Sequence, residues 1–214
     1  KAIRRQRQMC IRDRNRIICI SREFGSGGHE LGEHLSEKLG IKLFDSEIIT
    51  KVAELGNVPE DFVEEQGEAR DFRGFLGVMP AGHVATDITR DFVVTSEKLF
   101  ALQSIAIRQM AKDEGSCIFV GRCADVILQN QAECISVFVH SPLEDRIQRI
   151  MELRQITEKE AGKLIKRTDR ERASYHNYYT KIKWGHPSNY HLVLNMGKLG
   201  MENAVDLISY YVEH

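Results

Sequence analysis

The sequence predicts an α/β protein built around a parallel sheet with helices on both faces. Short apolar runs alternate along the chain with segments of helical period, which is typical of parallel strands joined by crossover helices. The 214 residues, 42% hydrophobic and 29% charged, suit one globular domain with a sizeable core. We expect five strands, at residues 17–20, 41–44, 117–120, 134–139 and 190–194.

The first strand runs into a glycine-rich turn, and residues 17–32 read IICISREFGSGGHELG. Leucines spaced four residues apart predict a helix after the turn, and Gly40 ends it. A strand, a glycine turn and a helix in this order present backbone N–H groups and the positive end of a helix to a phosphate. The alternative is a turn that only changes the chain direction. The turn residues are Gly25, Ser26, Gly27 and Gly28.

The standard phosphate-loop pattern is Gly-x-x-x-x-Gly-Lys-Ser/Thr. If Gly27 is its second glycine, Arg22 stands at the first glycine, Gly28 at the lysine and His29 at the Ser/Thr. The turn therefore keeps the backbone part of the pattern and lacks its two functional side chains.

The second strand, 41–44, ends at Asp45. Ser46 is expected to cap a helix over 47–55, and Gly56 to close it. Asp45 competes for the capping role, although its carboxylate could instead accept a hydrogen bond from a substrate.

Residues 57–69 are acidic and predict one more short helix. The stretch 70–94 holds several glycines and prolines without a sustained period, which is typical of a lid, a substrate lobe or a long surface loop. Thr95 then caps a long helix over 96–112, and Gly115 ends it. The later helices are expected at 124–129, at 143–154 after Ser141-Pro142, from the Thr157-x-x-Glu160 capping box to about Tyr175, and at 202–213.

Polar residues follow the carboxyl ends of four of these strands. Parallel sheets bind ligands beyond that edge, so a site is expected there. It comprises Arg22 to Gly28, Asp45, Gly121-Arg122 and His140.

The candidate cations for phosphate chemistry are arginines, because phosphoryl transfer asks mainly for positioning and positive charge. Those on the arginine-rich helix could equally form a solvated face, since acidic residues are interleaved with them. Asp125 could contact a substrate or cap a helix. Tyrosines 175, 178 and 179 could stack on a base or only pack. The arginines are Arg22, Arg122, Arg167, Arg170 and Arg172.

Charge and composition exclude several classes of protein. Residues 1–14 carry a net charge of +5 within a total of −1, so this basic segment is either a nucleic-acid arm or, as we favour, a disordered or foreign leader. The remaining chain is acidic, which argues against nucleic-acid binding. No apolar run approaches the roughly 18–20 residues of a membrane span. Five cysteines without a CxxC pair indicate reduced core thiols in a cytoplasmic protein, and the histidines lack metal-ligand spacing.

Five segments together resemble the cytidylate kinase-like proteins, relatives of bacterial cytidylate kinase. The resemblance runs from about residue 17 to the C-terminus, and the segments are ISREFGSGGHELG, LFDSEII, FVGRCADVIL, VFVHSPLEDRIQRI and DRERASYHNYYTKIKWGHPSNYHLVLN. It implies a P-loop kinase-type three-layer sandwich with strand order 2-3-1-4-5 and a helical lid. It also implies ATP and Mg²⁺ as the phosphoryl donor system and a nucleoside monophosphate, CMP or dCMP, as the acceptor.

The resemblance also carries roles to particular positions of this chain. Gly25, Ser26, Gly27, Gly28, His29 and Glu30 match the phosphate loop. Asp45 matches an aspartate near the monophosphate site, and Arg122 and Asp125 match a GR-x-x-D turn that contacts the acceptor. Arg167, Arg170 and Arg172 lie in the lid region, about 157–188. Residues from about 46 to 95 match the acceptor-binding insertion, within a single kinase-like domain over 15–214.

The loop departs from the pattern of these kinases at the lysine and at the Ser/Thr. Removing one donor to the transition-state charge costs on the order of 10²–10³ in rate. Arg22 is the expected replacement, because it starts the loop and its fork suits phosphate oxygens. Two further hypotheses stay open: a nucleotide-binding protein with weak or no turnover, and a P-loop kinase of another small acceptor. The oligomeric state is not predicted.

Overall fold

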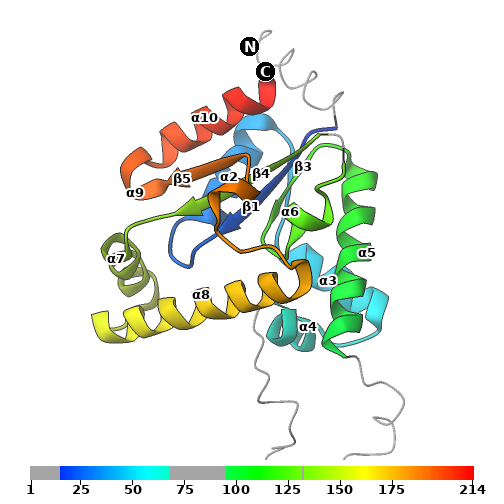
Figure 1. Cartoon of the computed structure of the whole chain (residues 1–214), viewed down its shortest axis with the longest axis horizontal. Helices are drawn as coiled ribbons and strands as arrows, with labels where there is room; N and C mark the ends of the chain where they lie inside the picture. Colours follow the sequence, from blue (N-terminus) through cyan, green and yellow to red (C-terminus); the bar gives the residue numbers. More distant parts are fainter. Residues whose placement is uncertain (1–14, 68–94, 132) are drawn as a thin grey trace, which may run out of the picture.

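The computed structural model describes residues 15–67, 95–131 and 133–214. In these ranges five parallel strands form one sheet in the order β2-β3-β1-β4-β5, which confirms the order expected from the resemblance. Helices lie on both sides of the sheet (Figure 1). The strands are β1 (Ile17–Arg22), β2 (Lys42–Phe44), β3 (Cys117–Val120), β4 (Cys134–His140) and β5 (Leu192–Asn195).

The helices follow the predicted alternation with the strands. No helix in the described ranges meets the length and apolarity needed to cross a membrane. The basic segment 1–14 and residues 68–94 of the predicted insertion lie outside those ranges. The helices are α2 (Gly28–Leu39), α3 (Ser46–Gly56), α4 (Glu60–Gly67), α5 (Ser96–Glu114), α6 (Ala124–Ile127), α7 (Leu143–Arg154), α8 (Glu158–Thr180), α9 (Met196–Leu199) and α10 (Met201–Glu213), with a 3₁₀ turn at Pro187–Asn189.

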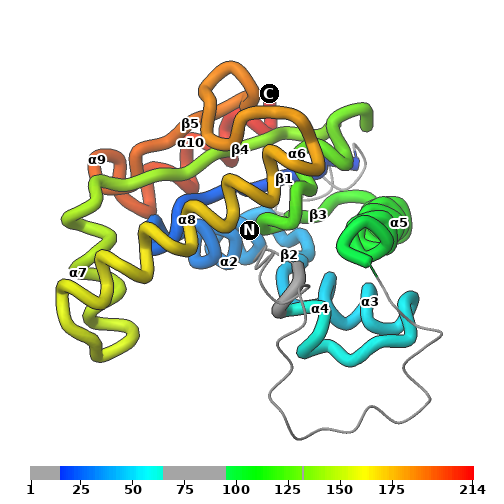
Figure 2. The backbone as a smooth tube through the Cα atoms, turned by 60° about the horizontal axis from the view of Figure 1, so that its bottom comes forward, coloured from blue at the N-terminus to red at the C-terminus, as the bar shows by residue number. Residues whose placement is uncertain are grey.

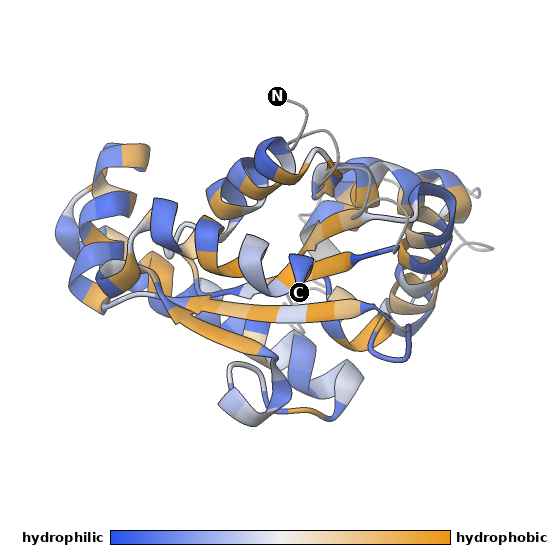
Figure 3. Ribbon diagram, turned by 90° about the horizontal axis from the view of Figure 1, so that it is seen from above, coloured by the Kyte–Doolittle hydropathy of each residue, from blue (hydrophilic) through white to orange (hydrophobic). Residues whose placement is uncertain are grey.

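Alternation along the strands creates two hydrophobic layers, one on each face of the sheet. Ile18 and Ile20 face α2 and α10, whereas Ile17 and Cys19 face α3, α5 and α6. The strands are coloured largely as hydrophobic in Figure 3, as expected for a sheet that is buried on both faces. Figure 2 shows α3 and α4 beside α5 at one side of the sheet, and α7 and α8 together at the other.

Two strand boundaries differ from the prediction by two residues, and the other differences are of one residue. β1 is longer than expected and ends at Arg22, because Ser21 and Arg22 pair with Phe138 and Val139 of β4. β5 begins at Leu192, two residues later than expected, and the ring of Tyr190 in the preceding loop packs on Phe138 at a centroid distance of 5.1 Å.

Helix ends confirm some capping predictions and correct others. Thr95 caps α5 and the Thr157–Glu160 capping box opens α8, as expected. The prediction that Ser46 caps α3 is wrong: Ser46 is the first helical residue, and Asp45 stands at the N-cap without a side-chain capping bond. α3 ends at a left-handed Asn57, one residue beyond the predicted Gly56.

The arginine-rich helix α8 continues to Thr180, beyond the expected end at Tyr175. An aromatic cluster explains the extension: the Phe100 ring of α5 stacks on Tyr179 at a centroid distance of 4.4 Å, and Tyr175 is buried beside them. These two tyrosines therefore pack α8 against α5.

Candidate functional site

The glycine turn between β1 and α2 is shaped by its own backbone and by one buried hydroxyl. Gly25 and Gly27 have φ angles of 81° and 84°, in the left-handed region that favours glycine. Ser26 is buried, and its hydroxyl donates to the carbonyl of Glu23 at 2.8 Å. The Ser26 side chain therefore stabilises the turn from within.

The N-terminus of α2 lies directly at this turn. Gly27 is the N-cap residue and provides no side-chain cap. The first N–H groups of a helix have no partner within the helix, and together with the helix dipole they attract anions. The start of α2 is thus suited to a phosphate chain, as a phosphate loop requires.

Three side-chain contacts between basic and acidic residues surround the first turn of α2. His29, at the predicted Ser/Thr position, is bound through Nδ1 to Asp45 Oδ2 at 2.7 Å, and its Nε2 lies 3.5 Å from Glu33. Glu30 pairs with Arg149 of α7. The Arg149 guanidinium also lies beside Gly27, with Nη1 3.7 Å from where a Cβ would be. Sequence reasoning missed Arg149, because nothing local to α7 indicates that it reaches the loop.

The turn after β3 has an unusual backbone. Gly121, Arg122 and Cys123 have φ angles of 76°, 56° and 56°, so three consecutive residues are left-handed. The Arg122 carbonyl accepts a hydrogen bond from buried Gln103 Nε2 at 2.8 Å, and Tyr175 Oη donates to Gln103 Oε1 at 3.4 Å. Burial raises the pKa of Tyr175, so its hydroxyl stays protonated and able to donate. Residues of α5 and α8 thus fix the turn that presents Arg122.

Asp125 lies just beyond this turn and is enclosed. Its Oδ2 is 3.3 Å from His176 Nε2 of α8, and both side chains are only 4% exposed. The helix-cap alternative does not hold for Asp125, because Cys123 is the N-cap residue of α6. His176, which the sequence did not single out, therefore joins the end of α8 to the predicted acceptor turn.

Three of the predicted arginines meet at one pocket at the carboxyl ends of β1 and β3. Arg22, Arg122 and Arg172 all line it. By contrast, Arg167 and Arg170 are exposed on α8, and Arg167 pairs with Glu171 at 3.7 Å. The pocket is lined by Ser21, Arg22, Gly121, Arg122, Cys123, Arg172, Tyr175, His176 and Trp184.

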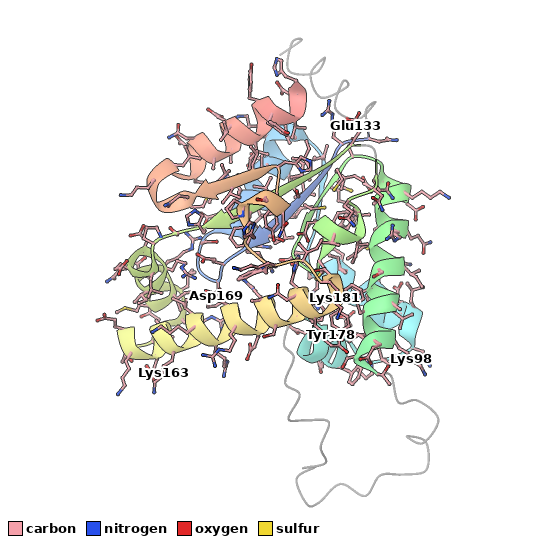
Figure 4. All side chains as sticks on the ribbon, viewed as in Figure 1. Lys98, Glu133, Lys163, Asp169, Tyr178 and Lys181 are labelled. Atoms are coloured by element: carbon pink, nitrogen blue, oxygen red, sulfur yellow. The ribbon has the colours of Figure 1, made fainter. Side chains whose placement is uncertain are left out.

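Helices α7 and α8 also bind the loop that follows β1. Asp169 of α8, labelled in Figure 4, accepts hydrogen bonds from the Phe24 N–H at 2.7 Å and from Arg146 Nη1 at 2.6 Å. Arg172 Nη1 donates to the Arg22 carbonyl at 3.3 Å. Residues 22–24 are therefore held from outside the loop by side chains of the predicted lid region.

Burial raises the pKa of Glu23 in this network, although nearby Arg146 acts in the opposite direction. The Arg146 Nε lies 3.5 Å from the Glu23 carboxylate. Desolvation outweighs the attraction because the loop packs closely against α7, where a Cβ on Gly25 would lie 3.1 Å from Ile150 and 3.3 Å from Arg146.

ATP and Mg²⁺, which the resemblance implies, fit the residues that are present. The uncapped start of α2 and the adjoining arginines suit a polyphosphate. In the described residues no group of three or more His, Cys, Asp or Glu could hold a metal ion alone. Mg²⁺ needs only one or two carboxylates when phosphates and water complete its shell. Asp45 and Glu33, which lie beside His29, are two carboxylates near the start of α2 that could bind the ion.

Comparisons with known proteins agree with this fold. An uncharacterized protein from Eubacterium ventriosum is similar, with 30% identity and a TM-score of 0.69 over 93% of this chain and 98% of that one. A shikimate kinase from Bacteroides thetaiotaomicron has 15% identity and a TM-score of 0.54 over 93% of this chain and 99% of its own. One from Acinetobacter baumannii, in complex with shikimate, has 13% identity and a TM-score of 0.51 over 92% of each chain. These two likenesses show the fold alone.

No curated protein matches the chain. The cytidylate kinase-like family matches residues 17–198, which include the glycine turn, the Gly121–Asp125 turn and all of α8. The chain therefore belongs to the cytidylate kinase-like family and has the fold of a P-loop kinase.

Proposed function

We propose that the protein transfers the γ-phosphoryl group of ATP to a nucleoside monophosphate, CMP or dCMP. The observation that carries this proposal is the meeting of Arg22, Arg122 and Arg172 at one pocket, with Arg22 also lying against Gly28 at the uncapped start of α2. Transfer between two phosphates brings several negative charges together, and fixed cations offset that repulsion. Family membership supports a nucleotide as the acceptor.

In this mechanism the glycine turn and the N-terminus of α2 bind the ATP phosphates, and Arg122 orients the acceptor phosphate. An oxygen of the acceptor phosphate forms a bond to the γ-phosphorus while the bond to the β–γ bridging oxygen breaks. ADP leaves with that electron pair. Mg²⁺, when bound with the nucleotide, neutralises part of the phosphate charge.

The roles of the remaining candidates are also proposals. Arg172 is the α8 arginine that faces the loop, whereas Arg167 and Arg170 are proposed lid residues on the exposed side of that helix. Asp45 is proposed at the edge of the acceptor site. Asp125 is proposed to position the Arg122 turn through His176.

A nucleotide-binding protein without turnover is the second candidate. The observation that favours it is that no lysine follows Gly27 and that Gly28 has no room for a side chain.

The test is turnover of the full chain with ATP and Mg²⁺ and each of CMP, dCMP, UMP, AMP, GMP and shikimate. We expect diphosphate formation with CMP or dCMP, and a fall in kcat/KM for the acceptor of about 10²–10³ in Arg122→Ala. Arg154→Ala, an exposed arginine at the end of α7, is the matched control and should behave as wild type. ATP binding without any turnover would favour the second candidate, and turnover of shikimate alone would show a different acceptor.

A further inference from the structure

Arg22 and Gly28 lie against each other at the two ends of the loop. The presence of the Arg22 side chain explains why residue 28 has none. A Cβ added at Gly28 would lie 2.6 Å from Arg22 Cβ and 2.8 Å from Arg22 Cγ. Both distances are shorter than real carbon contacts, so any residue with a side chain at position 28 collides with Arg22. One of the colliding atoms is the Arg22 Cβ. Its position is set by the backbone, so a change of rotamer does not relieve the collision.

We infer that Arg22 and Gly28 have exchanged the places that glycine and lysine hold in the standard phosphate-loop pattern. The loop cation then comes from the last residue of β1 instead of the first turn of α2. The base of the Arg22 side chain fills the space in which a residue 28 side chain would begin. This inference rests on the proposed function, because it names the residue that contacts the ATP phosphates.

The backbone holds Arg22 firmly for this role. Arg22 pairs with Val139 of β4, and its carbonyl accepts from Arg172 at 3.3 Å. The base of its side chain lies against Gly28 at the start of α2, and Arg22 lines the pocket together with Arg122 and Arg172. These backbone contacts fix the position from which the Arg22 side chain extends toward the pocket.

If the two residues have exchanged places, restoring glycine at position 22 should make room for a lysine at position 28. The φ angle of Gly28 is not in the left-handed region, and the three atoms nearest to a Cβ there are Arg22 Cβ, Arg22 Cγ and, at 3.1 Å, Val139 Cγ2. Arg22→Gly removes both colliding atoms, whereas Arg22→Ala keeps the Cβ at 2.6 Å. A lysine at position 28 should therefore be accommodated with glycine at position 22 but not with alanine.

The experiment compares Arg22→Gly, Arg22→Gly/Gly28→Lys and Arg22→Ala/Gly28→Lys with wild type, and Arg154→Ala serves as the surface control. Binding of ATP and of tripolyphosphate, turnover and Tm are measured for each. We expect Arg22→Gly to lose about 10²–10³ in turnover and to bind both polyphosphates more weakly. Adding Gly28→Lys to it should recover at least about tenfold, whereas the alanine double variant should recover nothing and have a lower Tm.

Two results would overturn the inference. One is an Arg22→Gly variant that binds polyphosphate and turns over like wild type. The other is a folded Arg22→Gly/Gly28→Lys protein no better than Arg22→Gly. If wild type binds tripolyphosphate through Arg22 but phosphorylates no acceptor, the proposed function fails and the exchange stands.

Discussion

At the scale of single residues, the candidate site contains unfavourable backbone conformations that are stabilised by neighbouring residues. Arg122 and Cys123 are non-glycine residues in the left-handed region, which costs on the order of 1–3 kcal/mol each. The hydrogen bond from Gln103 to the Arg122 carbonyl and the burial of the turn hold this conformation in place. A backbone kept in this way presents Arg122 to the pocket in a fixed direction.

Glu23 gives a residue-scale prediction about pH. Its pKa is raised by burial in the folded protein, so the folded state holds the Glu23 proton to a higher pH than the unfolded chain. The contribution of Glu23 to the free energy of unfolding is therefore fully present below the unfolded carboxyl pKa of about 4.3. It is lost as the pH rises through the folded pKa of Glu23. Glu23→Gln, which cannot ionise, should have a higher Tm than wild type, by a margin that grows with pH across this window.

Thermal unfolding from pH 4 upward in small steps checks this prediction. Glu152→Gln, at an exposed position on α7, is the control and should show no such growth. A Tm difference between Glu23→Gln and wild type that grows as the pH falls would contradict the prediction. It would mean that Arg146 has a larger effect on the pKa of Glu23 than desolvation has.

At the scale of elements, α8 connects the loop after β1 to the Gly121–Asp125 turn. Its middle holds the loop after β1 through Asp169 and Arg172, and its end holds the Gly121–Asp125 turn through His176. The capping box at Thr157 fixes where this helix begins, and the hydrogen bonds from Thr157 lower the pKa of Glu160. A displacement of α8 would therefore disturb the loop and the acceptor turn together.

Asp169 gives the element-scale prediction. Asp169→Ala removes the acceptor of the Phe24 N–H and leaves Arg146 without its closest carboxylate, so it should cost about 1–3 kcal/mol of stability. Amide hydrogen exchange should show faster exchange at Phe24 in this variant. Asp169→Asn keeps an oxygen acceptor and should preserve most of the protection, and Glu171→Gln on the same helix should leave Phe24 unchanged. Equal protection in Asp169→Ala would show that the loop holds its shape without α8.

At the scale of the whole molecule, stability rests on the two apolar layers that cover the sheet. Leu35 of α2 is fully buried against β1, β3 and α10, whereas Leu207 of α10 is 42% exposed. Leu35→Ala should lower the unfolding free energy by about 2–5 kcal/mol, because it leaves a cavity at the centre of one layer. Leu207→Ala, the same substitution at the surface, should change it by no more than about 0.5 kcal/mol. Urea denaturation measures both, and similar losses would contradict the assignment of the core.

The sequence by itself determined the features that depend on neighbouring residues. Strand-helix alternation, the glycine turn, the Thr95 cap and the Thr157–Glu160 capping box are all encoded within a few positions, and the structure confirms them. The alignment of Arg22 and Gly28 with the standard loop pattern was also visible in the sequence. The collision that links them was not, because it depends on how the end of β1 lies against the start of α2.

Only the tertiary structure decided which distant side chains meet. Arg149 reaches Gly27 and Glu30, His176 reaches Asp125, and Asp169 reaches Phe24 across wide sequence separations. The same packing turned Arg172 toward the loop and left Arg167 and Arg170 on the solvent side of α8. Helical period groups residues on faces, but which face meets the loop is fixed by the burial of Ala161, Ile165 and Tyr175 against α7 and α5. For this reason the sequence named the candidate arginines, and the fold selected those that share a pocket.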